Sequence, residues 1–204
     1  MESRDHTEII TALIMAFAGV LTSWCGYQAS LWSGDQSAAY TQANNLGVES
    51  VRSSNMAGQL VQVDINFFMQ WLDAFAKKDR RLAGYYRERF RPEFAHAFDI
   101  WLDSKPGKNP EALPTPFNRP AYRLAKEGEA AELQSQSNVK YKEGERANDI
   151  SDEYIRNTVL LSVVVMLVGS IQQYKNRKVR KTLLITSVVM MVFVLLHLVR
   201  APVH

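Results

Sequence analysis

The chain has 204 residues, of which 24 are Lys or Arg and 21 are Asp or Glu, so its net charge is +3. A chain of this length usually forms one or two domains. The positive excess is local, because residues 31–154 carry 16 basic and 18 acidic residues, a net charge of −2. This distribution argues against a nucleic-acid-binding protein, which needs a basic face or stripe.

Apolar residues are concentrated in three blocks, Ile9–Leu31, Val159–Ile171 and Leu183–Val199. A helix of about 20 apolar residues crosses the core of a bilayer. The blocks therefore predict an all-α membrane protein with three transmembrane helices and a long helical hairpin or stalk domain outside the cytoplasm. The predicted order is a cytoplasmic N-terminus (1–8), transmembrane helix 1 (9–31), an outer helical domain (32–153), transmembrane helix 2 (154–174), a basic cytoplasmic loop (175–182), transmembrane helix 3 (183–200) and an outer tail (201–204).

The first block is predicted to stay in place as a span rather than be cleaved as a signal peptide. Residues 1–8 hold one arginine and three acids, which is the wrong charge for a signal peptide, and no convincing cleavage site follows. Trp24, Tyr27 and Trp32 mark its outer end, because amphipathic rings favour the membrane interface. The one cysteine, Cys25, excludes a disulfide within the chain and is interpreted as a small apolar residue of this helix.

Small side chains form a stripe along transmembrane helix 1, at alternating spacings of four and three residues. They are Ala12, Ala16, Gly19, Ser23, Gly26 and Ser30. Small residues let membrane helices approach closely, so packing against another helix is the favoured interpretation. The alternative is the lining of a pore in an oligomer, with the hydroxyls of Ser23 and Ser30 facing the lumen.

Two long helices are predicted, because prolines are absent from residues 1–91 and 121–201. The first continues from transmembrane helix 1 to about Lys78, with a break allowed near Ser33–Gly34. The second begins near residue 121, continues through transmembrane helix 2 and ends near Tyr174.

Aromatic residues recur at helical spacing in two stretches of the outer domain. They are Phe67, Phe68, Trp71 and Phe75 in the first stretch, and Tyr86, Phe90, Phe94, Phe98 and Trp101 in the second. We interpret them as facing stripes of a helical hairpin that turns at Lys77–Arg81. Residues 104–120 hold five of the seven prolines and are predicted to form an extended loop that contacts the helices through Leu113 and Phe117.

Orientation is predicted from five basic residues between the second and third spans. They are Lys175, Arg177, Lys178, Arg180 and Lys181. The positive-inside rule places them in the cytoplasm. The N-terminus is then also cytoplasmic, and residues 32–153 lie in the periplasm if the membrane is a bacterial inner membrane.

Acidic residues are expected just outside the first two spans, with Asp35 above the first and Asp149, Asp152 and Glu153 above the second. One interpretation is a vestibule that attracts cations. The favoured one is a solvated helix turn in which Asp152 or Glu153 pairs with Arg156.

Motifs that carry chemistry are sparse. Glu93 and His96 have the Glu-x-x-His spacing of half a di-iron site, but the other histidines, at positions 6, 197 and 204, supply no second copy. We therefore expect no metal and no cofactor. His197 is expected at the outer interface, one turn from Arg200, rather than in a permeation path. Common catalytic motifs are missing from the sequence, which argues against an enzyme.

The chain resembles an uncharacterised family of small bacterial three-span inner-membrane proteins. The resemblance is carried by Trp24-Cys-Gly-Tyr-Gln-Ala-Ser-Leu-Trp32, by Tyr86-Arg-Glu-Arg-Phe-Arg-Pro-Glu-Phe94 and by Pro116-Phe117. It covers nearly the whole chain and implies the three-span plan and a bacterial inner membrane. It implies no activity and no functional residue.

The sequence favours a non-enzymatic scaffold or interaction platform that forms a homo-oligomer in the lipid bilayer, with a protein partner in the periplasm as a further expectation. Three short spans with a small-residue face seldom bury that face alone, which is the reason to expect self-association. The alternative is a pore lined by transmembrane helix 1. A second alternative is a periplasmic or intramembrane enzyme without recognisable motifs.

Overall fold

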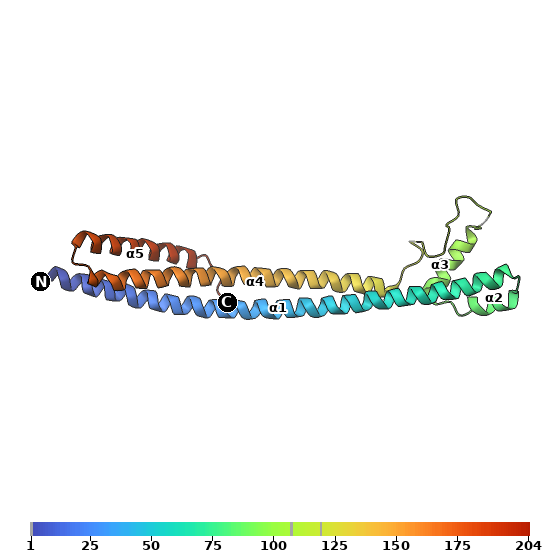
Figure 1. Cartoon of the computed structure of the whole chain (residues 1–204), viewed down its shortest axis with the longest axis horizontal. Helices are drawn as coiled ribbons and strands as arrows, with labels where there is room; N and C mark the ends of the chain where they lie inside the picture. The colour runs from blue at the N-terminus through green and yellow to red at the C-terminus, as the bar shows by residue number, and fades with distance from the viewer. Residues whose placement is uncertain (1, 107, 119) are drawn as a thin grey trace. The chain divides into compact units, whose positions relative to one another are not determined.

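The computed structural model describes residues 2–106, 108–118 and 120–204, with side chains from residue 8 onward in those ranges. The chain is 82% helical, and the described residues form no strand, which confirms the all-α class. Five α-helices and one short 3₁₀ helix are present in this part of the chain (Figure 1).

Helix α1 (Glu2–Ala76) is a single helix of 75 residues. It passes without interruption through Ser33 and Gly34, where the sequence allowed a break. An exposed glycine costs a helix only about 1 kcal/mol relative to alanine. That cost is too small to end a helix whose flanking turns pack against a neighbour, as those around Gln28 and Gln36 do.

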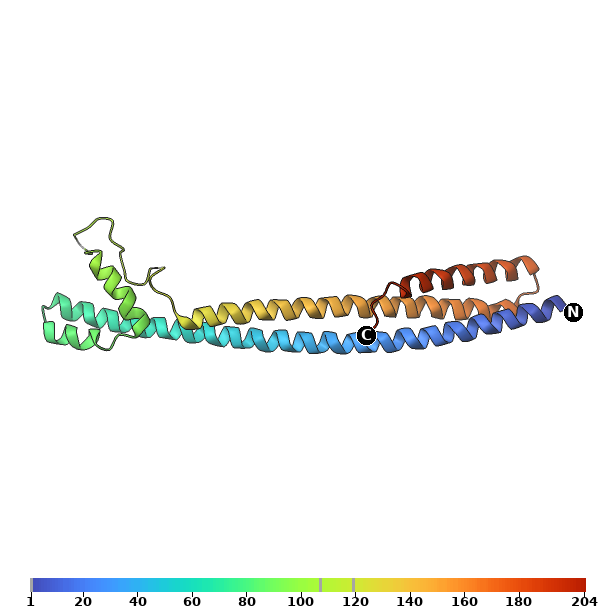
Figure 2. The ribbon, with the colours of Figure 1, turned by 180° about the vertical axis from the view of Figure 1, so that it is seen from behind.

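Helix α4 (Ala125–Ser170) is followed directly by the 3₁₀ helix η1 (Ile171–Gln173). The second long predicted helix is therefore confirmed, with a start four residues later than expected. Buried residues recur mostly at spacings of three, four or seven positions along both α1 and α4. This is the pattern of two helices packed along one seam, and Figures 1 and 2 show α1 and α4 side by side.

The chain divides into two compact units. Unit 1 comprises Met1–Gln42 and Val139–His204, and unit 2 comprises Ala43–Asn138. Both long helices contribute residues to each unit.

Unit 1 contains three helices, because α5 (Arg177–Leu198) packs beside α1 and α4. Its apolar core consists of Ile14, Ala18, Cys25, Ala29, Ile150, Tyr154, Leu161, Val164, Val168 and Val194. In the described chain, α1, α4 with η1, and α5 are each long and apolar enough to cross a membrane. The three predicted spans therefore correspond to three real helices.

Unit 2 has an aromatic core, and its two short helices correct the predicted hairpin. The second aromatic stripe is divided between α2 (Arg80–Arg87) and α3 (Pro92–Asp103). Pro92 occupies the first turn of α3 and Arg91 is extended, because the residue before a proline is driven out of the helical region. Phe68, Phe94, Phe98 and Trp101 are buried, whereas Phe75 is exposed.

The proline-rich segment 104–120 forms turns, with no helix or strand in its described residues. It covers the core as expected, since the Phe117 ring stacks on Phe94 at 5.1 Å between centroids. Leu113 contributes differently from the expectation. Its side chain is exposed, and its carbonyl accepts a 2.8 Å hydrogen bond from Nε1 of Trp101.

Serine hydroxyls in unit 2 hold α1 and α4 together at their backbones. Ser50 Oγ donates to the carbonyl of Ala130, and Ser137 Oγ donates to the carbonyl of Ala43, both at 2.7 Å. A serine side chain is short, so its hydroxyl reaches the backbone of the other helix only where the two helices lie close together. The seam between the helices is therefore narrow in this unit.

Candidate functional sites

The predicted small-residue stripe lies on the outside of unit 1. Its six residues, Ala12, Ala16, Gly19, Ser23, Gly26 and Ser30, are all exposed. Helix α1 instead contacts α4 through a different face that includes Ala18, Cys25 and Ala29. A Cβ atom at Gly19 or Gly26 would meet nothing within 4 Å. The stripe is thus free to pack against something other than the described part of this chain, and both of its interpretations remain predictions.

Two of the predicted outer acids, Asp35 and Asp149, lie at a similar level along the helices of unit 1. Gln36 Nε2 donates a 2.8 Å hydrogen bond to Asn148 Oδ1, so the neighbouring Asp35 and Asp149 lie at a similar height. Asp35 Oδ2 lies 2.9 Å from Nε2 of His204.

The other two acids contact their own helix. Glu153 lies 3.8 Å from Arg156, as the sequence suggested, and both side chains are exposed. Asp152 accepts a 3.2 Å hydrogen bond from Asn148 Nδ2. These contacts fit the solvated helix turn better than a focused acidic ring.

Residues 201–204 fold back onto the helices of unit 1, which the sequence did not suggest. The Tyr154 hydroxyl donates to the carbonyl of Pro202 at 3.1 Å, and the His204 amide donates to Gln28 Oε1 at 2.9 Å. The His204 ring lies edge-on to Trp32, 5.3 Å between centroids. Gln28 is buried in the structure. Its position as a polar residue within an apolar block was the one signal in the sequence that a polar partner would lie there.

The predicted basic loop 175–182 is largely helical. Four of its five cations, Arg177, Lys178, Arg180 and Lys181, belong to the first turns of α5, and only Lys175 precedes the helix. Asn176 begins the helix, because its side chain accepts a 2.9 Å hydrogen bond from the amide of Lys178. The predicted orientation depends only on the charges being next to the span, and it remains a prediction.

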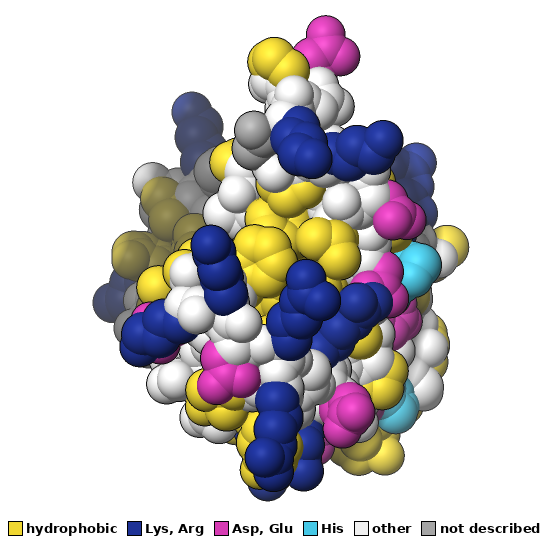
Figure 3. All heavy atoms as spheres, turned by 90° about the vertical axis from the view of Figure 1, so that its right-hand side faces the viewer, with side chains coloured by type: hydrophobic (Ala, Val, Ile, Leu, Met, Phe, Trp, Pro, Cys, Tyr) yellow, Lys and Arg dark blue, Asp and Glu magenta, His cyan; other side chains and the backbone are white. Residues whose placement is uncertain are grey.

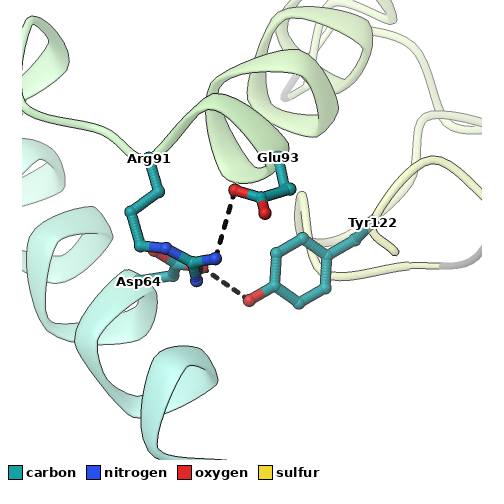
Figure 4. Close-up of polar contacts among 4 residues, drawn as sticks. All are labelled: Asp64, Arg91, Glu93 and Tyr122. Carbon is teal, nitrogen blue, oxygen red and sulfur yellow. Dashed lines mark hydrogen bonds and ion pairs between the residues drawn. The ribbon is translucent and has the colours of Figure 1, made fainter. Parts of the chain in front are cut away.

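A buried acidic cluster in unit 2 joins segments that are distant in sequence (Figure 4). Asp64 lies on the inner face of α1 and is only 1% exposed. Its Oδ2 accepts a 2.7 Å hydrogen bond from the Tyr122 hydroxyl and a 3.1 Å bond from Arg91 Nη1. Arg91 also pairs with Glu93 at 3.1 Å. The cluster links α1, the start of α3 and the segment that leads into α4.

Burial dominates the electrostatics of this cluster. It raises the pKa of Asp64, although the Tyr122 hydrogen bond and the Arg91 charge act in the opposite direction. Burial also raises the pKa of Tyr122, and its hydrogen bond to Asp64 adds to that shift. Tyr122 therefore stays protonated, and its hydrogen bond to Asp64 joins the segment before α4 to α1. The sequence offered one signal for it, an acid in the buried register of α1.

The predicted Glu-x-x-His pair is divided between different surroundings. Glu93 is bound to Arg91, and His96 is exposed. Within the described chain, no three His, Cys, Asp or Glu side chains are grouped closely enough to hold a metal ion.

A pocket of about 690 Å³ opens in unit 2 between the end of α1 and α2. Its lining residues are Trp71, Phe75, Ala76, Lys78, Asp79, Arg80, Ala83, Gly84 and Arg87. Figure 3, which faces this end, shows hydrophobic side chains gathered between Lys and Arg side chains. The aromatic residues here were expected in the core and the basic ones in a turn, so nothing in the sequence indicated the pocket.

No family model, curated protein or solved structure matches this chain. The resemblance to small bacterial three-span proteins therefore stays a prediction, and the assignment of function depends on the geometry described above.

Proposed function

We propose that the protein is a non-enzymatic membrane scaffold that self-associates through the small-residue stripe of α1 and presents unit 2 as an interaction platform. One observation carries this proposal. In the most apolar windows of α1, α4 and α5, only 17%, 33% and 11% of the residues are buried within the chain. Such apolar surface is stable only in lipid or against other helices.

Self-association is favoured over a lone anchor by the position of the stripe. Lipid chains cover bulky apolar side chains well, but they gain little from a groove of glycines and alanines. A second helix gains close backbone contact there, and Gly19 and Gly26 have open space above them. A second copy of α1 is the simplest partner, because identical surfaces pair in symmetric oligomers.

The proposed setting is a bacterial inner membrane, with the N-terminus in the cytoplasm and residues 32–153 in the periplasm. Support comes from the basic residues at the start of α5, which adjoin an apolar helix. Unit 2 would then be available to periplasmic partners.

The proposal is tested by the native mass of the full chain in lipid nanodiscs. Wild type is expected to form a defined oligomer, and a Gly19→Leu/Gly26→Leu double variant is expected to lower its mass. Gly169→Leu is the matched control, because Gly169 is exposed on α4 and a Cβ there would make only an ordinary 3.6 Å contact with Met15. A monomeric wild type, or equal loss in the control, would contradict the proposal.

A pore is the second candidate, because Ser23 and Ser30 lie on the same exposed face and Asp35 and Asp149 lie at one level beyond it. It predicts ion flux in reconstituted bilayers that changes in Ser23→Leu without loss of the oligomer. A scaffold predicts no flux in any variant.

A further inference from the structure

The pocket in unit 2 has an aromatic floor. The Trp71 and Phe75 rings stack at 5.0 Å between centroids with an interplanar angle of 16°. Phe75 is 60% exposed, whereas Trp71 beneath it is 6% exposed. Ala83 and Gly84 of α2 also line the pocket and contribute almost no side-chain bulk. The floor of the pocket is therefore apolar and open to solvent through Phe75.

Basic side chains line the edge of this pocket. Lys78, Arg80 and Arg87 are all exposed, and Asp79 is the only acid among the lining residues. The Asp79 carboxylate is already used, since it accepts a 3.0 Å hydrogen bond from the Leu82 amide.

Two of these cations have no partner among the described residues. Arg87 is paired with Asp99 and lies over the Phe98 ring. Lys78 and Arg80 make no side-chain ion pair or hydrogen bond with any residue that the structure describes. Two unpaired cations beside an apolar floor form a site for an anionic head group with an apolar body.

One of these cations lies in the turn that follows α1. Lys78 has a φ of 61°, in the left-handed region where glycine is the usual residue. The turn is closed by hydrogen bonds from the Lys78 amide to Phe75 and from the Asp79 amide to Ala74, both 3.0 Å. These bonds fix the backbone of Lys78 at the edge of the pocket.

We propose that this pocket binds a single-chain fatty acid, with the carboxylate between Lys78 and Arg80 and the alkyl chain on the Trp71–Phe75 pair. A volume of about 690 Å³ suits one small ligand. A carboxylate matches the fork of an arginine and the point charge of a lysine. A cationic amphiphile of equal length would meet two uncompensated positive charges. This binding activity goes beyond the scaffold role and does not depend on self-association.

The test uses the full chain in zwitterionic phosphatidylcholine nanodiscs with a photoactivatable diazirine analogue of dodecanoate. Cross-linked residues are mapped by mass spectrometry, and labelling of the spans by probe dissolved in lipid serves as the internal reference. Labelling is expected within residues 71–87. Excess dodecanoate should abolish it, whereas excess dodecyltrimethylammonium, which has the same chain and the opposite charge, should not.

Two sets of variants test the basic residues and the open volume of the pocket separately. Lys78→Glu/Arg80→Glu should lower apparent affinity at least about ten-fold, as expected for the loss of charge-assisted hydrogen bonds. Gly84→Trp should block the pocket. Gly84 lines the pocket and a Cβ there meets nothing within 4 Å, so the indole can occupy the open volume. Gly58→Trp is the control, since Gly58 is helical, exposed and equally open.

Several outcomes would overturn the proposal. Equal competition by the two amphiphiles would show a plain hydrophobic surface without charge selection. Labelling that persists in Gly84→Trp would place the ligand elsewhere. Native mass spectrometry that finds a polypeptide rather than a fatty acid in unit 2 would assign the pocket to a peptide. Near-ultraviolet circular dichroism confirms that each variant is folded, and Gly84→Ala, which leaves the pocket open, should bind like wild type.

Discussion

The Tyr122 hydroxyl donates a 2.7 Å hydrogen bond to the carboxylate of Asp64, across 58 residues of sequence. This bond fixes the end of the proline-rich segment against the inner face of α1. Because Asp64 is buried, the loss of either partner should lower the stability of the whole of unit 2.

Tyr122→Phe should lower the free energy of unfolding of unit 2 by about 1–3 kcal/mol, because it leaves a buried carboxylate with one donor fewer. The thermal midpoint in near-ultraviolet circular dichroism, which reports the aromatic core, measures the effect. Tyr85→Phe is the control, since Tyr85 is half exposed and its hydroxyl has no hydrogen bond among the described contacts. Equal effects in the two variants would show that the Asp64 bond contributes nothing specific.

The pH dependence of stability should follow from the raised pKa of Asp64. Burial favours the protonated carboxyl in the folded state. A raised folded pKa gives stability that is complete below the unfolded pKa and is lost as the pH rises through the folded value. The stability of wild type relative to Asp64→Asn should therefore fall as the pH rises from below the ordinary value of 3.8 through the raised one.

The comparison of wild type with Asp64→Asn cancels the other titrating groups, which both proteins share. Thermal midpoints collected between acidic and neutral pH suffice. A difference that grows in favour of wild type with rising pH would mean that the Arg91 pairing outweighs burial.

Even one added methyl group at Gly144 should disturb the packing of α1 against α4. A Cβ there would lie 2.5 Å from Cδ1 of the Tyr40 ring, which also packs on Tyr141. Gly144→Ala should thus destabilise unit 1 by roughly 1–3 kcal/mol through overpacking, despite its better helix propensity. Gly58→Ala, where a Cβ has open space, should stabilise by about 0.5–1 kcal/mol. Thermal unfolding in nanodiscs compares them, and a stabilising Gly144→Ala would show that Tyr40 moves aside freely.

Lys78→Gly should separate stability from binding. Glycine relieves the left-handed strain at φ of 61°, which is worth about 1 kcal/mol. The variant should unfold at a higher temperature than wild type and bind dodecanoate more weakly. If it binds as well as wild type, the strained lysine has no part in the pocket.

Orientation is open to direct labelling in a Cys25→Ala background. Lys108→Cys should react with a membrane-impermeant maleimide in intact spheroplasts, whereas Lys175→Cys should react only after lysis. Both positions are exposed in the structure, so access through the protein is not limiting. The opposite pattern would reverse the proposed topology.

Much of the helical plan was predictable because it depends on local properties. Three apolar blocks and the absence of proline from residues 1–91 were enough to predict the three spans and the length of α1. The break between α2 and α3 could also have been predicted from the sequence, since Pro92 begins α3. The helical periodicity did not indicate it, because Phe90 and Phe94 keep a helical spacing across the break.

The candidate sites were harder to predict from the sequence. Two sets of small residues occur on α1, and the stripe from Ala12 to Ser30 looked like the better contact surface. The structure shows that α4 instead packs on Ala18, Cys25 and Ala29. The choice between faces depends on both helices, whose registers are set by distant residues.

By itself, the sequence determined where the chain is helical and which helices suit a membrane, because helix formation and partition into lipid are sums over about 20 neighbouring residues. Only the tertiary structure decided that Tyr122 reaches Asp64, that His204 reaches Gln28, and that Lys78 and Arg80 border an open aromatic floor. Those contacts join segments that are distant in sequence or meet across a turn. Their existence depends on the register of one packed helix against another, which no local pattern of residues specifies.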